Sequence, residues 1–175
     1  MTLSTHYTNP ANLAAIDAAA VSAATKTIDF AAYSLTEPDT INALLARARA
    51  GVAIRLYLDR SELEAEARGN PSLPTSPLHQ LLGVPGITIL IKRSMILMHL
   101  KSYLVDNATL RDGSTNFSPL GEGLQDNSLL FTDDPAAIAL FAAKFQAMWA
   151  RPDNMNVPEA IEQSSVYAAN RPRSR

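Results

Sequence analysis

The sequence predicts an α/β fold from three observations. Segments with strand and helix patterns alternate along the chain. Near the N-terminus a strand, a helix and a second strand follow in order, and a crossover helix of about a dozen residues is what a parallel strand pair requires. A chain of 175 residues with 47% hydrophobic content can bury one sizeable core, but it is too short for two ordinary domains. We therefore expect one globular domain.

The first element is expected to be a helix over residues 10–24. This segment is rich in alanine, and Leu13, Ile16 and Val21 recur at roughly helical spacing. Asn9 precedes a proline, which is a typical N-cap followed by proline in the first turn.

The β-α-β unit follows directly. Residues 27–35 have the alternating, β-branched character of a strand. Residues 36–39 open a helix that should end near Gly51, after two arginines. Residues 52–59 are expected to form the next strand.

The second half of the chain contains more strands and a closing helix. Residues 60–77 are charged and proline-rich and indicate a loop, with a short helix at 78–82. Asp134 starts a last helix, whose apolar stripe is typical of a core-facing surface. The expected strands are 87–91, 101–106, 108–114 and 127–132.

The ends and the charge limit the possible functions. We expect a domain over residues 1–155 and a C-terminal tail, 156–175, that is partly disordered because it is rich in serine, proline and arginine. A net charge of -2 argues against bulk coating of nucleic acid, so contact with a polyanion must be local. Lys92 and Arg93 are the candidate substrate-binding residues.

The sequence does not indicate a membrane-spanning, disulfide-bonded, metal-binding or nucleotide-binding protein. The sequence has no apolar run long enough to span a membrane, so a soluble protein is expected, in the cytoplasm or the periplasm. It has no cysteine, which excludes disulfides and thiolate metal sites. Its three histidines lack metal-ligand spacing and it has no nucleotide-binding glycine motif, so we expect neither a metal nor a cofactor.

The chemically informative segment runs from His99 to Asn116. Residues two apart in a strand share a face, so His99 and Lys101 should project together, as should Ser114 and Asn116 from the neighbouring strand. An imidazole can attack phosphorus, while an ammonium, a hydroxyl and an amide can hold its charged oxygens. This combination indicates a phosphodiester site. Gly113 would let the backbone approach a ligand closely.

Asp106 belongs to the same segment but is expected to have a structural role. It lies five residues after Lys101, so in a regular strand it faces the other way. We interpret it as a hydrogen-bonding carboxylate that fixes the strand end.

These residues match the pattern H-x-K-x4-D-x6-G-S-x-N at every fixed position, and the chain thereby resembles the phospholipase D-like superfamily. Residues 30–35 and 52–59 look like the first two core strands of that family. The segments 116–118 and 125–127 are similar to those of its small, single-motif bacterial endonucleases. The likeness covers residues 8–150.

The resemblance implies a mixed β-sheet with helices on both faces. It also implies hydrolysis in two steps, in which His99 forms a covalent phosphohistidine that water then releases. Lys101, Asn116 and Ser114 would stabilise the phosphoryl oxygens without a divalent metal. Asp126 stands where the family usually has the glutamate that orients the histidine, and Glu122 is a rival.

A single motif predicts a homodimer, because in-line displacement needs a proton donor opposite the nucleophile and one imidazole cannot occupy both positions. An endonuclease is the leading interpretation. A phospholipase D or phosphatidyl transferase acting on phospholipid is the alternative, and a non-catalytic phosphate-binding dimer is the third. The apolar run 95–98 is expected to be a buried strand, with a lipid-facing rim as the alternative.

Overall fold

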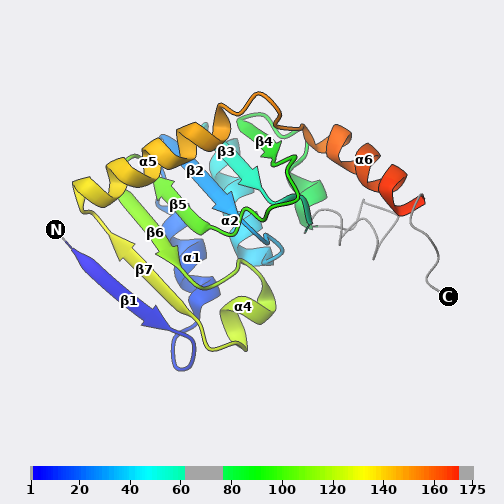
Figure 1. Ribbon diagram of the computed structural model, residues 1–175. Coiled ribbons are helices and arrows are strands. Elements are labelled where there is room, and N and C mark those ends of the chain that lie inside the picture. The colour runs from blue at the N-terminus through cyan, green and yellow to red at the C-terminus, as the bar shows by residue number, and fades with distance from the viewer. Residues whose placement is uncertain (1, 62–76, 170–175) are drawn as a thin grey trace.

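The computed structural model describes residues 2–61 and 77–169 and contains one seven-stranded sheet flanked by helices (Figure 1). The strand order is β1-β7-β6-β5-β2-β3-β4. Most of the predicted proline-rich loop and the terminal arginines lie outside the described residues. The strands are β1 (Leu3–Tyr7), β2 (Thr27–Ala32), β3 (Ala53–Leu58), β4 (Ile87–Ile91), β5 (Lys101–Val105), β6 (Thr109–Gly113) and β7 (Ser128–Thr132).

The sheet is mixed, as predicted. Strands β2, β3 and β4 run parallel to one another, while the remaining neighbours in the sheet pair antiparallel. The parallel part contains the β-α-β unit expected from the sequence. The antiparallel part brings together the two halves of the polar motif, since β5 and β6 are adjacent.

Helices cover both faces of this sheet, which confirms the predicted α/β class. Figure 1 shows α5 crossing one face while α1 and α2 lie behind the other. The helices are α1 (Leu13–Ser22), α2 (Pro38–Arg49), the short 3-10 helix η2 (Pro77–Leu81), α4 (Pro119–Gly123), α5 (Pro135–Trp149) and α6 (Val157–Ala169).

Strand periodicity divides the core into two layers. In β2, Phe30 packs into the cluster under α1 and α2, while its neighbour Ala31 packs into the cluster under α5. The same alternation places Tyr103 and Leu104 of β5 in opposite clusters. Both faces are therefore buried, because successive side chains of a strand point to opposite sides.

The predicted structure differs from the observed structure near both ends of the chain. The first helix begins at Leu13, and Asn12 rather than Asn9 is its N-cap, accepting a 3.1 Å hydrogen bond from the Ala15 amide. Pro10 follows a cis peptide bond in the preceding turn and is not part of the helix. Near the other end, α6 lies where a tail was expected, and its residues Val157 and Ala160 are buried.

The predicted strand at residues 95–98 is wrong. These residues lie in the segment between β4 and β5, without strand pairing, and Met95, Ile96 and Leu97 are exposed. Only Met98 is buried, against the α5 side of the sheet. The prediction failed because residues 95–98 are all apolar, which is also typical of a buried strand. The strand that follows them, β5, starts only at Lys101.

Asp106 fixes the end of β5 against the start of β2, as predicted. Its carboxylate accepts four hydrogen bonds of 2.7 to 2.8 Å, from the amide and hydroxyl of Thr25 and from the amides of Lys26 and Thr27. These donors hold the pKa of Asp106 down at about 2, against a partial desolvation that raises it. Asp106 itself has a positive φ of 53°, at the turn that leads into β6.

We predict that Asp106→Asn lowers the free energy of unfolding by about 1–3 kcal/mol, because an amide cannot accept all four bonds. The folded pKa of about 2 lies below the ordinary value of 3.8, so the difference between wild type and variant should be complete above pH 3.8 and should shrink as the pH falls toward 2. Urea unfolding at a series of pH values measures it. Asp153→Asn, an exposed carboxylate, is the control. Equal stability of both variants at neutral pH would contradict the assignment.

Candidate functional site

His99 and Lys101 lie side by side where the chain enters β5, and Tyr33 packs against both. The rings of His99 and Tyr33 are 4.7 Å apart in an edge-to-face arrangement. The Lys101 Nζ atom lies 4.9 Å from the centre of the Tyr33 ring and donates a 2.8 Å hydrogen bond to the His99 carbonyl. His99 is exposed, whereas Lys101 is only 6% exposed. An accessible imidazole thus sits beside a largely buried cation.

Tyr33 also fixes the backbone here. Its amide donates a 2.9 Å hydrogen bond to the Leu100 carbonyl, extending the β2–β5 pairing by one step toward His99. The sequence predicts Tyr33 only as part of a core strand at residues 30–35. Its contact with the motif could have been anticipated only by knowing that β2 and β5 are neighbours.

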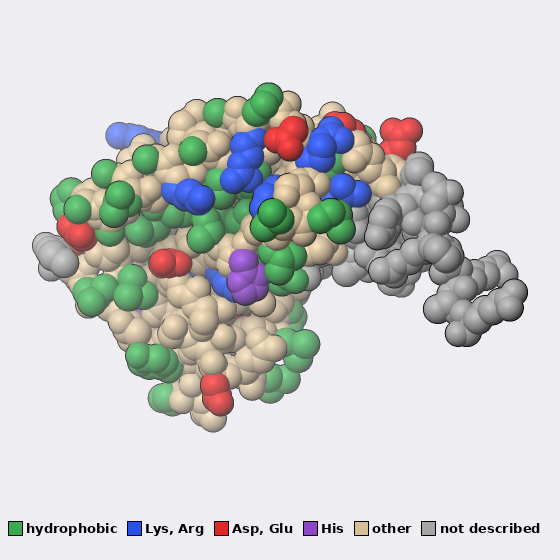
Figure 2. All heavy atoms as spheres, viewed as in Figure 1, with side chains coloured by type: hydrophobic (Ala, Val, Ile, Leu, Met, Phe, Trp, Pro, Cys, Tyr) green, Lys and Arg blue, Asp and Glu red, His purple; other side chains and the backbone are tan. Residues whose placement is uncertain are grey.

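His99 lines a pocket of about 300 Å³ together with basic side chains from three parts of the chain. Lys92 follows β4, Lys144 comes from α5 and Arg151 follows α5. Figure 2 shows basic side chains gathered beside a histidine on this face, with hydrophobic side chains next to them. The pocket therefore combines a nucleophilic ring with local positive charge, although the whole chain carries a net charge of -2.

The two halves of the motif are joined by Arg111, which is fully buried. Its Nη1 atom donates to the carbonyls of Lys101, at 2.5 Å, and Thr115, at 3.3 Å. Its other donors form a bidentate ion pair with Asp17 of α1, at 3.0 and 2.6 Å. The guanidinium thus ties the start of β5 to the segment after β6, where Ser114 and Asn116 lie.

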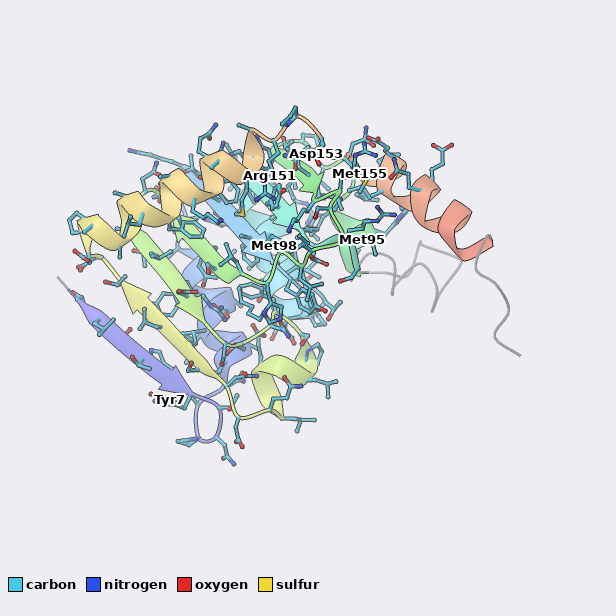
Figure 3. The ribbon with its side chains drawn as sticks, in the orientation of Figure 1. Tyr7, Met95, Met98, Arg151, Asp153 and Met155 are labelled. Carbon is cyan, nitrogen blue, oxygen red and sulfur yellow. The ribbon has the colours of Figure 1, made fainter. Side chains whose placement is uncertain are left out.

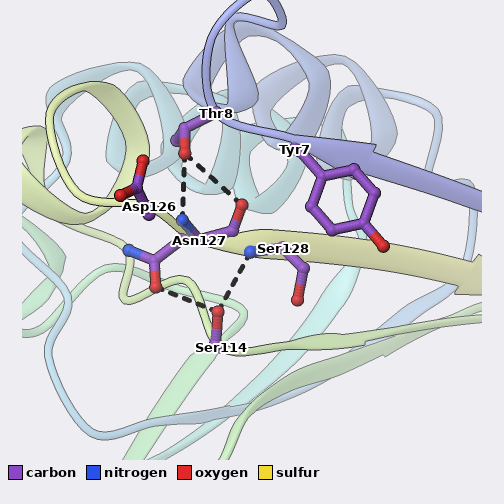
Figure 4. Close-up of a pocket in the computed structure, with 6 residues that line it drawn as sticks. All are labelled: Tyr7, Thr8, Ser114, Asp126, Asn127 and Ser128. Carbon is purple, nitrogen blue, oxygen red and sulfur yellow. Dashed lines mark hydrogen bonds between the residues drawn. The ribbon is translucent and has the colours of Figure 1, made fainter.

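Ser114 serves mainly to join two strands in this structure. Its hydroxyl donates to Asn127 at 2.9 Å and accepts from the Ser128 amide at 3.0 Å (Figure 4). Asn127 in turn donates to the Gly121 carbonyl at 2.9 Å. The Ser114 hydroxyl therefore satisfies a backbone group of β7, which the sequence analysis did not predict, and Asn127 is a supporting residue that it did not select.

The reason for Gly113 also differs from the one expected. A Cβ at this position would lie 2.3 Å from the Ser128 carbonyl oxygen and 3.1 Å from the Leu129 Cα. The backbone of β7, rather than a ligand, therefore requires the glycine, and its φ of 149° adds to the requirement.

Asn116 presents an unused acceptor. Its amide oxygen is buried and has no hydrogen-bond partner among the described residues. The following residue, Phe117, is buried in the core and its carbonyl accepts from the amides of Thr36 and Glu37 at 2.7 and 2.9 Å. Asn116 is therefore held beside the segment between β2 and α2, and its amide oxygen makes no hydrogen bond to another described residue.

Neither candidate carboxylate reaches His99. Asp126 is exposed and lines a different pocket, of about 280 Å³, beside Ser114 and Tyr7 (Figure 4). Glu122 is buried, and desolvation together with the negative charge of Asp17 raises its pKa to about 9. Within the described part of the chain no hydrogen bond to the His99 ring is formed, from either acid or from another group.

The two predicted substrate-binding residues have different surroundings. Lys92 lines the His99 pocket, and its ammonium donates to the carbonyls of Ile96 and Leu97. Arg93 instead forms an ion pair with Glu159 of α6 and donates to the Asp153 carbonyl at 3.0 Å. Lys144 and Arg151, which sequence reasoning did not select, line the pocket in its place.

No group of three or more histidine and acidic side chains suited to a metal ion occurs within residues 2–61 and 77–169. Over the same residues, none of the helices is both long and apolar enough to cross a bilayer.

Comparison with known proteins finds a family model, curated relatives and solved structures that match this chain. Residues 18–149 match the family model described as "Cardiolipin synthase, PLD-like domain". Two mitochondrial cardiolipin hydrolases, from Chlamydomonas reinhardtii and Xenopus laevis, are 22% and 23% identical over 126 residues, which is 72% of this chain. Only 52% and 56% of those two proteins are matched, so the chain spans about half the length of these curated relatives.

Two solved structures share the fold. NucT from Helicobacter pylori is 20% identical with a TM-score of 0.72, and the match covers 85% of this chain and 95% of NucT. Nuc from Salmonella typhimurium, a phospholipase D family member, is 23% identical with a TM-score of 0.71, covering 89% of this chain and 98% of Nuc.

We predict that Glu122→Gln becomes more stable relative to wild type as the pH rises. The pKa of Glu122 is about 9 in the folded chain and 4.5 ordinarily, so its contribution to stability is complete below pH 4.5 and is lost as the pH rises toward 9. Glutamine stays neutral throughout and lacks this loss. Urea unfolding at a series of pH values tests the prediction, with the exposed Glu162→Gln as control. A stability difference that does not change with pH would show that Glu122 is not held protonated.

Proposed function

Because the chain belongs to the phospholipase D-like superfamily, we propose that it is a phosphodiesterase that uses His99 as its nucleophile. The observation that carries the proposal is the exposed His99 ring in a pocket lined by Lys92, Lys144 and Arg151, with the Lys101 ammonium held beside it. A phosphodiester is an anion, so cations favour its binding and stabilise the charge that grows on its oxygens during attack.

The proposed reaction has two steps. A ring nitrogen of His99 forms a bond to phosphorus while the bond to the leaving oxygen breaks, and that oxygen takes a proton from an acid on the opposite side. Water then attacks phosphorus, gives up a proton to the same group, and breaks the phosphorus–nitrogen bond. Lys101 and Asn116 are proposed to hold the non-bridging oxygens, with Ser114 positioning the segment that carries Asn116.

The opposite acid is proposed to be His99 of a twin subunit. In-line displacement separates the two proton-transfer positions by the phosphorus atom, and the chain carries one copy of the motif. A twofold homodimer places the same patch of each copy face to face, which brings two imidazoles to one phosphate.

Nucleic acid is the proposed substrate. The short, single-motif proteins that the chain resembles are endonucleases, and Nuc and NucT share its fold over most of their length. The basic pocket supplies the local positive charge that a polynucleotide backbone requires.

Phospholipid is the second candidate, and one observation favours it. Met95, Ile96 and Leu97 are exposed four to two residues before His99, which suits a substrate held at a lipid surface. The two cardiolipin hydrolases that match the chain are named for a phospholipid substrate.

We predict that His99→Ala lowers turnover by at least about a thousandfold, because the attacking nitrogen is removed. An exposed ring contributes little packing, so circular dichroism and the unfolding midpoint should not change. The assay compares DNA, RNA and phosphatidylcholine vesicles in the presence of a chelator, since the proposed mechanism needs no divalent metal. The matched control is the exposed His79→Ala, which lies outside the pocket. Substantial activity in His99→Ala would remove this residue from the nucleophile's role.

If nucleic acid is the substrate, its binding should weaken steeply as salt rises. We predict that Lys92→Gln with Lys144→Gln reduces the slope of log affinity against log salt by about one for each phosphate that these lysines neutralise. Fluorescence anisotropy with labelled DNA and RNA measures the slope. Arg93→Gln should change the slope less, because Arg93 forms an ion pair with Glu159. The control is Lys26→Gln, an exposed lysine outside the pocket. An unchanged slope in the double variant would exclude the pocket as the phosphate-binding surface.

We predict a dimer whose two subunits share one site. Light scattering at assay concentration should give twice the mass of a chain of 18.9 kDa. Mixing wild type with an excess of His99→Ala should reduce activity below the value expected from dilution, since mixed dimers hold only one imidazole. A fully active species of monomer mass would refute the shared site.

A further inference from the structure

An exposed apolar tip, which we define as Met95, Ile96 and Leu97, projects from the segment between β4 and β5. These side chains are 64%, 78% and 49% exposed. Figure 3 labels Met95 and Met98 on this segment, and Met98 lines the same pocket as Arg151. Exposed apolar residues occurring singly need no explanation, but three in succession form a patch that water solvates poorly.

The apolar tip is held at both of its ends. Before it, the Lys92 amide donates to the Leu58 carbonyl at 3.1 Å. After it, the Met98 amide donates to the buried carboxylate of Asp59 at 2.5 Å. The Lys92 ammonium bonds carbonyls within the segment, those of Ile96 and Leu97. The backbone is therefore fixed while the three apolar side chains point into solvent.

Positive charge adjoins the apolar tip. Leu97 lines the His99 pocket together with Lys92, Lys144 and Arg151, so apolar and cationic side chains share one surface. Apolar groups that enter the acyl boundary, next to cations that attract anionic headgroups, are the combination that binds a charged bilayer.

We infer that the apolar tip docks the protein on an anionic phospholipid membrane, with Lys92, Lys144 and Arg151 facing the headgroups. The surface fits a bilayer better than a second copy of the chain for two reasons. A stable protein interface buries roughly 800 Å² per partner, and three side chains cover far less surface than that. A bilayer also supplies the negative charge that complements the three cations. Docking would hold the His99 pocket at the membrane surface, where phospholipid, the second candidate substrate, lies.

Docking is tested with the full chain carrying His99→Ala, so that no lipid is consumed and the result does not depend on the proposed activity. Flotation with vesicles of equal parts phosphatidylcholine and phosphatidylglycerol should recover the protein, and vesicles of phosphatidylcholine alone should recover much less. Adding Met95→Ser, Ile96→Ser and Leu97→Ser should weaken binding by about tenfold or more. Leu3→Ser with Leu140→Ser, two equally exposed leucines elsewhere, should have no effect.

A second readout does not depend on the triple variant. Ile96→Trp, also in the His99→Ala background, should show a blue shift of tryptophan emission with the anionic vesicles, measured against the parent with Trp149 alone. Failure to float with anionic vesicles, or equal flotation of the triple serine variant, would overturn membrane docking. Loss of the dimer in the triple variant, with vesicle binding unchanged, would instead identify the apolar tip as a subunit contact and would also overturn it.

Discussion

The buried ion pair between Asp17 and Arg111 connects the first helix to the strands that carry the polar motif. Arg111 has no exposed surface, and its Nη1 atom bonds the carbonyls on both sides of the site, those of Lys101 and Thr115. Tyr103 donates to the same Asp17 carboxylate at 2.7 Å, and Phe117 lies 4.4 Å under the guanidinium. Removing one member of such a pair costs about 3–5 kcal/mol, since the other charge is left buried and unpaired.

The site is bonded to the protein behind and open in front. Behind the motif, the side chains of Arg111, Asp106 and Ser114 hydrogen-bond backbone groups of neighbouring segments. In front, His99 is exposed and faces a pocket whose basic residues come from separate parts of the chain. A preorganised backing of this kind would let the groups that we propose for catalysis keep their geometry, which is the condition for charge stabilisation in a transition state.

The nucleic-acid and lipid interpretations rest on different parts of the same face. The cations of the pocket suit any phosphodiester, whereas the apolar tip is useful only at a surface that accepts apolar side chains. A shared phosphate chemistry therefore leaves the choice of substrate to the groups around the site. Neither Asp126 nor Glu122 is hydrogen-bonded to the His99 ring among the described residues, since Asp126 lines another pocket and Glu122 is buried beside Asp17.

The α/β class, most strand positions and the polar motif could be predicted from the sequence, as could the strand-end role of Asp106. These features depend on two-residue periodicity and short fixed spacings. Contacts between distant residues depend instead on how the strands and helices pack. Asp17 and Arg111 are 94 positions apart, and Tyr33 reaches His99 only because β2 and β5 pair. Burial also depends on tertiary packing. An apolar run such as 95–98 has the same pattern in a buried strand and in a projecting segment, and only the neighbouring elements determine whether it is covered.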